Sequence, residues 1–196
     1  MASSATTKLT PRQRGGRTIN AVAELLRQVL SVPNIYLEPP ASLISADVLA
    51  VDRAGAGDLH AVEIKLDSDL KPFKGSWEKP SISKEINELY AIWYPQFRER
   101  VQAIHHRLMA MPAHFRYLAV PVKSFGMVFG ELSGFGLFSP DGIGRLGIIL
   151  VTESADEPPR ASLSAVPERF RVHPAKLSSI ENRLLSKSRP DIEVRI

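Results

Sequence analysis

Apolar residues recur at helical spacing in three parts of the chain, and each repeat predicts an amphipathic helix. The first repeat begins at Thr18, a residue suited to cap a helix, and ends before Pro33. A second, longer repeat follows Ser83 and includes Pro95, and a third lies near 177–185. Each helix is expected to pack its apolar stripe against a common core.

Shorter apolar runs that end at turn residues predict strands. Two of them are expected to pair as a hairpin around residues 53–58, and a further hairpin is expected around 140–142. The predicted strands are 34–38, 46–52, 59–66, 115–122, 135–138 and 145–151. The order helix, three strands, helix, strand predicts an α/β fold, to which the second hairpin and a last helix are added.

Length and composition predict one folded domain rather than two. The chain has 196 residues, of which 44% are hydrophobic and 23% charged, values ordinary for a globular protein. Residues 1–17 are polar and basic and predict a flexible arm before a single domain at 18–196. The chain has no cysteine, and neither a secretion signal nor a membrane-spanning segment is evident. We therefore expect a cytoplasmic protein without membrane association.

Basic residues are in excess in the arm and at 169–189, and the connection 67–80 adds lysines; all three segments could meet phosphate. The net charge is +4, and the arm contributes Arg12, Arg14 and Arg17. The polar connection 67–80 contributes Lys71 and Lys74, which directly follow the strand 59–66. Such segments bind nucleic acid in many proteins, but short basic tails also serve solubility, so charge alone leaves a DNA partner open.

Three charged residues interrupt the apolar strands of the first hairpin. In a strand, side chains alternate between faces, so Glu63 and Lys65 share one face. A turn centred near Gly55 and Ala56 places Asp47 opposite this pair. Two carboxylates at one point repel each other unless a cation compensates them. Asp47, Glu63 and the backbone carbonyl of Ile64 would suit Mg²⁺ or Mn²⁺, with Lys65 beside a metal-bound water.

Asp47 and Glu63-Ile64-Lys65 resemble the signature of the PD-(D/E)XK, or restriction-endonuclease-like, nuclease superfamily. That signature is an aspartate that opens one strand and Glu-x-Lys on the next. The core of the superfamily is also helix, three strands, helix, strand, which corresponds to residues 18–122. Ala46 stands where the family often has proline.

The resemblance implies a mixed sheet flanked by helices and magnesium-dependent hydrolysis of phosphodiester bonds in DNA. Some members of the superfamily add an acid from the first helix, and Glu24 corresponds to it. Others add a polar residue from the helix after Glu-x-Lys, for which Lys84 and Glu85 are candidates. Because members that cut both strands often pair two active sites, a homodimer or larger complex is an expected assembly.

Two other readings of the sequence remain open. The same fold also occurs as a catalytically inactive module that binds nucleic acid or a protein partner, and Glu-x-Lys is frequent on exposed strands as a surface ion pair. In the other reading, the basic arm of an unrelated interaction domain binds an acidic partner. This last reading requires that Asp47, Glu63 and Lys65 do not converge.

Overall fold

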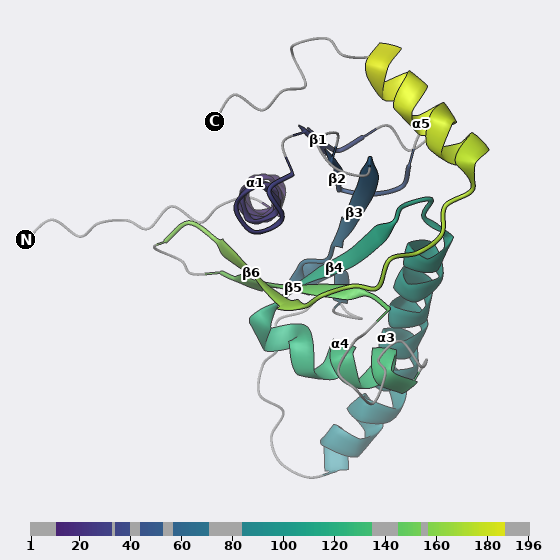
Figure 1. Cartoon of the computed structure of the whole chain (residues 1–196). Coiled ribbons are helices and arrows are strands. Elements are labelled where there is room, and N and C mark those ends of the chain that lie inside the picture. Colours follow the sequence, from purple (N-terminus) through teal and green to yellow (C-terminus); the bar gives the residue numbers. More distant parts are fainter. Residues whose placement is uncertain are drawn as a thin grey trace, which may run out of the picture.

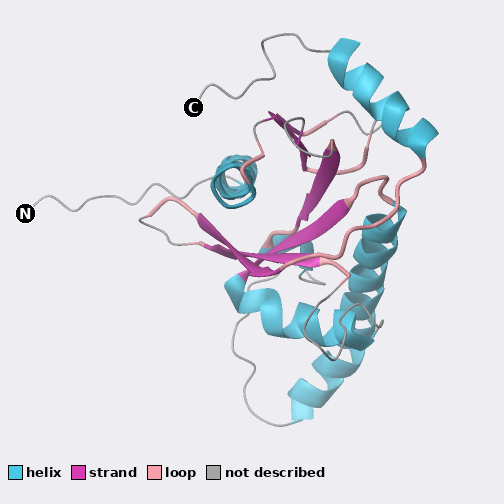
Figure 2. Cartoon of the chain, in the orientation of Figure 1, coloured by secondary structure: helices cyan, strands magenta, loops and turns pink. Residues whose placement is uncertain are grey.

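The computed structural model describes residues 11–32, 34–39, 44–52, 57–70, 84–134, 145–153 and 157–186. Within these ranges the chain forms both helices and strands (Figure 2). Their bounds, in chain order, are α1 Pro11–Leu30, β1 Asn34–Leu37, β2 Val48–Asp52, β3 Asp58–Ile64, α2 Asp67–Leu70, α3 Lys84–Ala110, β4 Phe115–Pro121, α4 Val122–Gly134, β5 Gly147–Thr152, β6 Arg160–Ala165 and α5 Pro174–Ser186.

The strands form one mixed sheet in the order β1-β2-β3-β4-β5-β6. β1, β2 and β3 are antiparallel to one another, β3, β4 and β5 are parallel, and β6 returns antiparallel to β5. Parallel neighbours require crossover connections, which α3 provides between β3 and β4 and α4 provides between β4 and β5. The fold is therefore α/β with a six-stranded mixed sheet.

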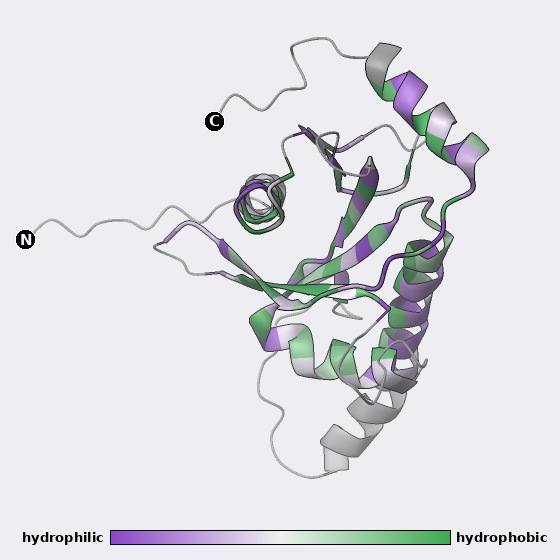
Figure 3. Ribbon diagram, in the orientation of Figure 1, coloured by the Kyte–Doolittle hydropathy of each residue, from purple (hydrophilic) through white to green (hydrophobic). Residues whose placement is uncertain are grey.

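Helices cover both faces of this sheet (Figure 1). α1 packs on one face, where Val22 and Leu26 meet alternate strand residues such as Val62. α3 and α4 pack on the other face, where Phe97 and Leu132 meet the intervening residues such as Ala61. Hydrophobic residues are frequent on α4, hydrophilic residues lie along part of α3, and the strands carry both kinds (Figure 3). The alternation along β3 thus decides which helix each side chain faces.

The first hairpin confirms the sequence prediction, whereas the predicted start of the first helix is wrong. β2 and β3 pair from Val48↔Val62 to Asp52↔Asp58, as the turn residues indicate. The helix, however, begins at Pro11, so residues 11–17 of the expected arm are helical. Thr18 does not cap it but lies in its interior with only 1% of its surface exposed. Proline is well suited to a helical first turn, which explains the earlier start.

The second half of the chain departs further from the expectation. No element was predicted for residues 123–133, yet they form most of α4 despite Gly126 and Gly130. The strand 145–151 is present as β5, but it pairs with β6 in a hairpin around 153–159. The expected strand 135–138 and its turn at 140–142 lie outside the described residues. No helix of the described ranges is long and apolar enough to cross a membrane.

Candidate functional site

The end of the β2–β3 hairpin brings Asp47 and Glu63 together. Asp47 directly precedes β2, and its backbone N–H donates to the carbonyl of Val62 over 2.9 Å. Its side-chain Oδ2 accepts a hydrogen bond from the N–H of Ile64 over 2.6 Å. The carboxylate therefore replaces a backbone acceptor at the point where the antiparallel ladder ends. Because the N–H and carbonyl of one strand residue point to the same side, the Ile64 carbonyl also faces β2.

Glu63 is a buried carboxylate held by two cations. Its side chain is 4% exposed, and Oε1 lies 2.6 Å from Lys65 Nζ and 3.2 Å from Arg107 Nη1. Lys65 follows on the same strand, and its backbone N–H donates to the carbonyl of Ala119 in β4 over 2.9 Å. Arg107 comes from α3, the helix that covers this face of the sheet. The pairing offsets much of the cost of burying the Glu63 charge.

Asp47 lacks such direct compensation. Burial raises the pKa of the Asp47 carboxyl above its ordinary value, and the nearby Glu63 carboxylate raises it as well. The hydrogen bond from Ile64 and the charges of Lys65 and Arg107 act in the opposite direction without cancelling the rise. Among the described residues, the side chain of Asp47 accepts a hydrogen bond through Oδ2 only. Its site therefore favours either a proton or a further cation.

Polar side chains continue beyond this point, at the carboxyl ends of the parallel strands β3 and β4. Asp67, at the start of α2, accepts a hydrogen bond of 2.7 Å from Ser124 Oγ and forms an ion pair with Lys123. Both partners lie in the first turn of α4. Arg100 Nη1 of α3 donates to the carbonyl of Asp69 over 3.1 Å. These contacts connect α2 to α3 and α4 at this end of the sheet.

The opposite end of β3 carries a second charged cluster, which is fully paired. Asp58 accepts hydrogen bonds from Arg169 Nη2 at 2.6 Å and Nε at 3.1 Å. These bonds hold the pKa of the Asp58 carboxyl below its ordinary value. His114 Nδ1 lies 3.4 Å from Asp58, but it accepts the N–H of Leu59 over 3.0 Å and so carries no proton there. Burial correspondingly lowers the pKa of His114.

The remaining predicted site residues do not join the Asp47 cluster in the part of the chain that the structure describes. Glu24 lies on α1, on the other face of the sheet, where it accepts a hydrogen bond from Gln28 over 2.6 Å and pairs with Arg27. Lys84 opens α3, and Arg12 and Arg14 lie in the first turn of α1, but their side chains are not described. Lys71 and Lys74 lie outside the described residues.

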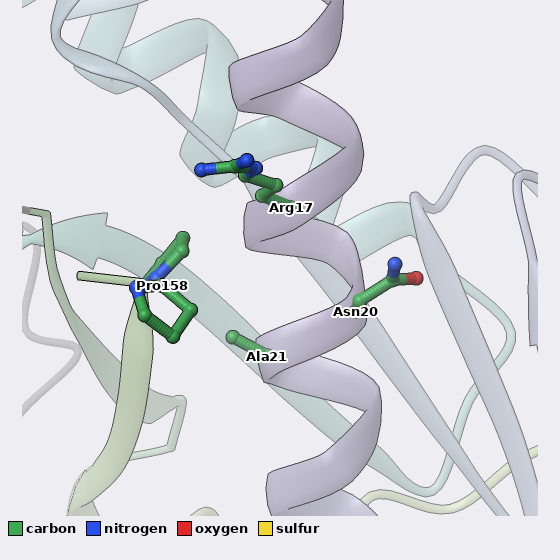
Figure 4. Close-up of a pocket in the computed structure, with 5 residues that line it drawn as sticks. Arg17, Asn20, Ala21 and Pro158 are labelled. Carbon is green, nitrogen blue, oxygen red and sulfur yellow. The ribbon is translucent and has the colours of Figure 1, made fainter. Parts of the chain in front are cut away.

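Arg17 is exposed on α1 and lines a hollow between this helix and the β5–β6 connection. Figure 4 shows Arg17 and Ala21 on the side of α1 that faces Pro158. Asn20 and Pro159 complete the lining, which includes none of Asp47, Glu63 and Lys65. Arg17 thus belongs to a separate surface from the carboxylate cluster.

Arg107 is a site residue whose contact with Glu63 the sequence did not predict. The spacing of apolar residues in α3 gives a hint of this contact. Arg107 lies beside Ile104 and Leu108, both of which are buried against the sheet. A cation next to a buried stripe is positioned to reach a strand charge. The strand that it would meet could not be identified without the register of the whole sheet.

The donor set fits a hard divalent cation in part. Asp47 and Glu63 offer carboxylate oxygens and Ile64 offers a carbonyl, which are the ligand types that Mg²⁺ binds together with water. Among the described residues no group of three or more His, Asp or Glu side chains is arranged to hold a metal. Mg²⁺ sites with only one or two carboxylates are common because the ion retains several waters.

Comparisons with known proteins add no functional assignment. No protein-family model matches the chain, and no curated protein matches it. A solved structure of a protein of unknown function from Silicibacter pomeroyi is similar at 16% identity over 91% of this chain and 86% of that one. Its TM-score is 0.43, which is too low to carry an argument.

Proposed function

We propose that the chain is a magnesium-dependent nuclease of the PD-(D/E)XK type that hydrolyses phosphodiester bonds in DNA. The observation that carries the proposal is the meeting of Asp47, Glu63 and Lys65 at one end of the β2–β3 hairpin. The order of the first elements, α1-β1-β2-β3-α3-β4 apart from the short α2, supports the proposed restriction-endonuclease-like core.

The electrostatics of the cluster support a bound cation. Asp47 and Glu63 repel each other, and the burial of Asp47 makes its ionised form costly. Both cations contact Glu63, and no ion pair of the described residues involves Asp47. Asp47 is the acid that gains most from a ligand with positive charge.

In the proposed reaction, each chain residue has a separate task. Held by Asp47, Glu63 and the Ile64 carbonyl, Mg²⁺ would supply a Lewis acid and lower the pKa of bound water. Lys65, 16% exposed, lies where it can hydrogen-bond the attacking water and stabilise charge on the phosphate oxygens. The water would give up a proton to solvent as its oxygen bonds to phosphorus, the bridging P–O bond would break, and the leaving oxygen would take up a proton from solvent.

A second candidate function is a nuclease-fold module without activity that binds nucleic acid or a protein partner. The specific observation in its favour is the neutralisation of Glu63 by Lys65 and Arg107, which satisfies this carboxylate without a metal. The two candidates differ in the behaviour of Asp47. An inactive module gains nothing from ionised Asp47, whereas a nuclease requires it as a ligand.

The test is cleavage of plasmid and single-stranded DNA by the whole chain with Mg²⁺, with Mn²⁺ and with EDTA. The nuclease proposal predicts nicking or degradation that requires the divalent ion and disappears in Glu63→Gln. Glu24→Gln is the matched control, because Glu24 lies on the other face of the sheet. Absence of any cleavage together with absence of Mn²⁺ binding by calorimetry would leave the inactive module as the function.

A further inference from the structure

One carboxylate oxygen of Glu63 is shared by two cations of different character. Oε1 contacts Lys65 Nζ at 2.6 Å and Arg107 Nη1 at 3.2 Å. Lys65 lies on β3 itself, where the backbone hydrogen bond to Ala119 fixes its position. Arg107 reaches the same oxygen from α3, and its side chain is 45% exposed. The longer and more exposed contact is the easier one to exchange.

A divalent cation at Asp47 and Glu63 would weaken the ion pair between Arg107 and Glu63. With the cation held there, a lone pair of the Glu63 carboxylate would be engaged in coordination, and positive charge would lie next to the guanidinium. Both effects weaken the Arg107 contact, and a half-exposed guanidinium can leave at little cost. Its planar set of donors matches the oxygens of a phosphate.

We propose that Arg107 is a positioning residue that exchanges Glu63 for a substrate phosphate when a divalent cation binds. The inference rests on the proposed function and adds a coupling between the metal and the substrate. In the absence of metal, Arg107 neutralises Glu63 and is withheld from DNA. Metal binding releases it at the place where the reacting phosphate must lie, so each ligand strengthens the binding of the other.

Two other described arginines of α3 have different partners. Arg98 lies 3.7 Å from Glu131 of α4, and Arg100 donates to the carbonyl of Asp69. Neither of these contacts involves Asp47 or Glu63. Arg100 is the matched control, because it has the same charge on the same helix and donates to a backbone carbonyl of α2.

The experiment compares the wild type with Arg107→Gln, Arg107→Lys and Arg100→Gln as full chains. Calorimetry with Mn²⁺ alone measures metal affinity, and anisotropy of a labelled DNA duplex measures DNA affinity in EDTA and in Ca²⁺. Circular dichroism checks that each variant is folded. Because Arg107→Lys keeps the positive charge, it tests the role of charge separately from the planar donor geometry.

Arg107→Gln should bind Mn²⁺ about threefold more tightly, because a competing cation is gone. Its DNA affinity should fall by on the order of tenfold in Ca²⁺ and remain unchanged in EDTA, with a salt slope about one unit smaller in Ca²⁺. Arg107→Lys should have near wild-type Mn²⁺ affinity and intermediate DNA affinity. Arg100→Gln should leave Mn²⁺ affinity unchanged.

Two results would overturn the inference. One is weaker Mn²⁺ binding by Arg107→Gln, and the other is an equal loss of DNA affinity with and without the divalent ion. If the wild type binds Mn²⁺ and cleaves DNA while either result holds, only the inference fails. If the wild type binds no Mn²⁺, the proposed function fails and the exchange at Arg107 fails with it.

Discussion

The two ends of strand β3 both carry acids and bases, but their charges are organised differently. At Asp58 the carboxylate receives two hydrogen bonds from Arg169, and the neighbouring His114 is a neutral acceptor for a backbone N–H. At Glu63 two cations share one oxygen, while Asp47 is partly buried beside a like charge. The pKa of Asp58 is lowered and that of Asp47 is raised.

This difference separates a structural cluster from a candidate functional one. Asp58 and Arg169 connect β3 to the segment that leads from β6 to α5, which crosses the end of the sheet (Figure 1). The nearby N–H of Phe170 donates to the carbonyl of His114 over 2.7 Å, and the Phe170 ring lies 3.9 Å from the Arg116 guanidinium. Every group there has a partner that stabilises the fold. At Asp47, by contrast, a bound cation would stabilise the ionised carboxylate.

The largest expected effect concerns Lys65. Lys65→Met keeps the length of the side chain but removes the charge that would stabilise the phosphate, so cleavage should fall on the order of 10³-fold while Mn²⁺ still binds. Lys123→Met is the control, because Lys123 of α4 is exposed and pairs with Asp67 of α2 rather than with Glu63. Initial rates of plasmid nicking measure both. Equal losses in the two variants would remove the special role of Lys65.

Gly147, which pairs with Tyr117 in the sheet, offers a test of packing near the Asp58 end of β3. A Cβ on this residue would lie 2.7 Å from Tyr117 Cε1 and 2.9 Å from Pro167 Cδ, closer than packed atoms allow. Tyr117 is fully buried and lies 3.1 Å from His60 Nδ1, so its ring cannot withdraw easily. Gly147→Ala should lower the free energy of unfolding by about 3 kcal/mol, measured by urea denaturation.

Gly130→Ala is the matched control for this substitution. Gly130 lies on the exposed side of α4 with no atom within 4 Å of an added Cβ. Alanine is the better helix former, so this variant should gain about 0.5–1 kcal/mol. Similar stability changes in the two variants would show that contact with Tyr117 does not decide the cost at Gly147.

Substitution of the two acids at the candidate site should change stability in opposite directions. Glu63→Gln removes the anion shared by Lys65 and Arg107 and should cost about 1–2 kcal/mol. Asp47→Asn removes a partly buried charge, retains an oxygen that can accept the Ile64 N–H, and should raise the free energy of unfolding. Urea denaturation at neutral pH without metal measures both. A loss of stability in Asp47→Asn would contradict the claim that the ionised Asp47 carboxylate destabilises the metal-free fold.

A smaller effect should appear on acidification at the Asp58 end. Burial lowers the pKa values of His60 and His114, so the unfolded chain binds more protons than the folded one below about pH 6.5. Stability is therefore present above that pH and lost as the pH falls towards the folded-state values, by at most about 1.4 kcal/mol per pH unit for each histidine. Urea denaturation at pH 5 to 7.5 measures the slope.

The variant that tests this slope is His114→Asn, whose side-chain oxygen can still accept the Leu59 N–H but does not titrate. Its stability should decrease less between pH 7.5 and 5 than that of the wild type. Parallel curves for the two proteins would show that His114 takes no part in the acid response.

Local patterns in the sequence were sufficient for the hairpin and the acids at its end. The turn predicted near Gly55 gave the register that β2 and β3 have, and alternation along the strand then predicted Glu63 and Lys65 on one face beside Asp47. Arg107 could not be placed in this way, because its contact depends on how α3 crosses the sheet, a property that no local pattern encodes. Polar Ser162 and Ser164 in β6 also gave no strand signal, since that edge strand faces solvent at alternate positions.

The central claim is that Asp47 serves function and Asp58 serves the fold, and one paired measurement tests it most directly. Metal-dependent DNA cleavage and urea unfolding are measured side by side for Asp47→Asn and Asp58→Asn, with cleavage assayed where both variants are folded. We predict that Asp47→Asn loses cleavage without losing stability, while Asp58→Asn loses stability and still cleaves. Cleavage by Asp47→Asn at the wild-type rate, or its loss in folded Asp58→Asn, would contradict the claim.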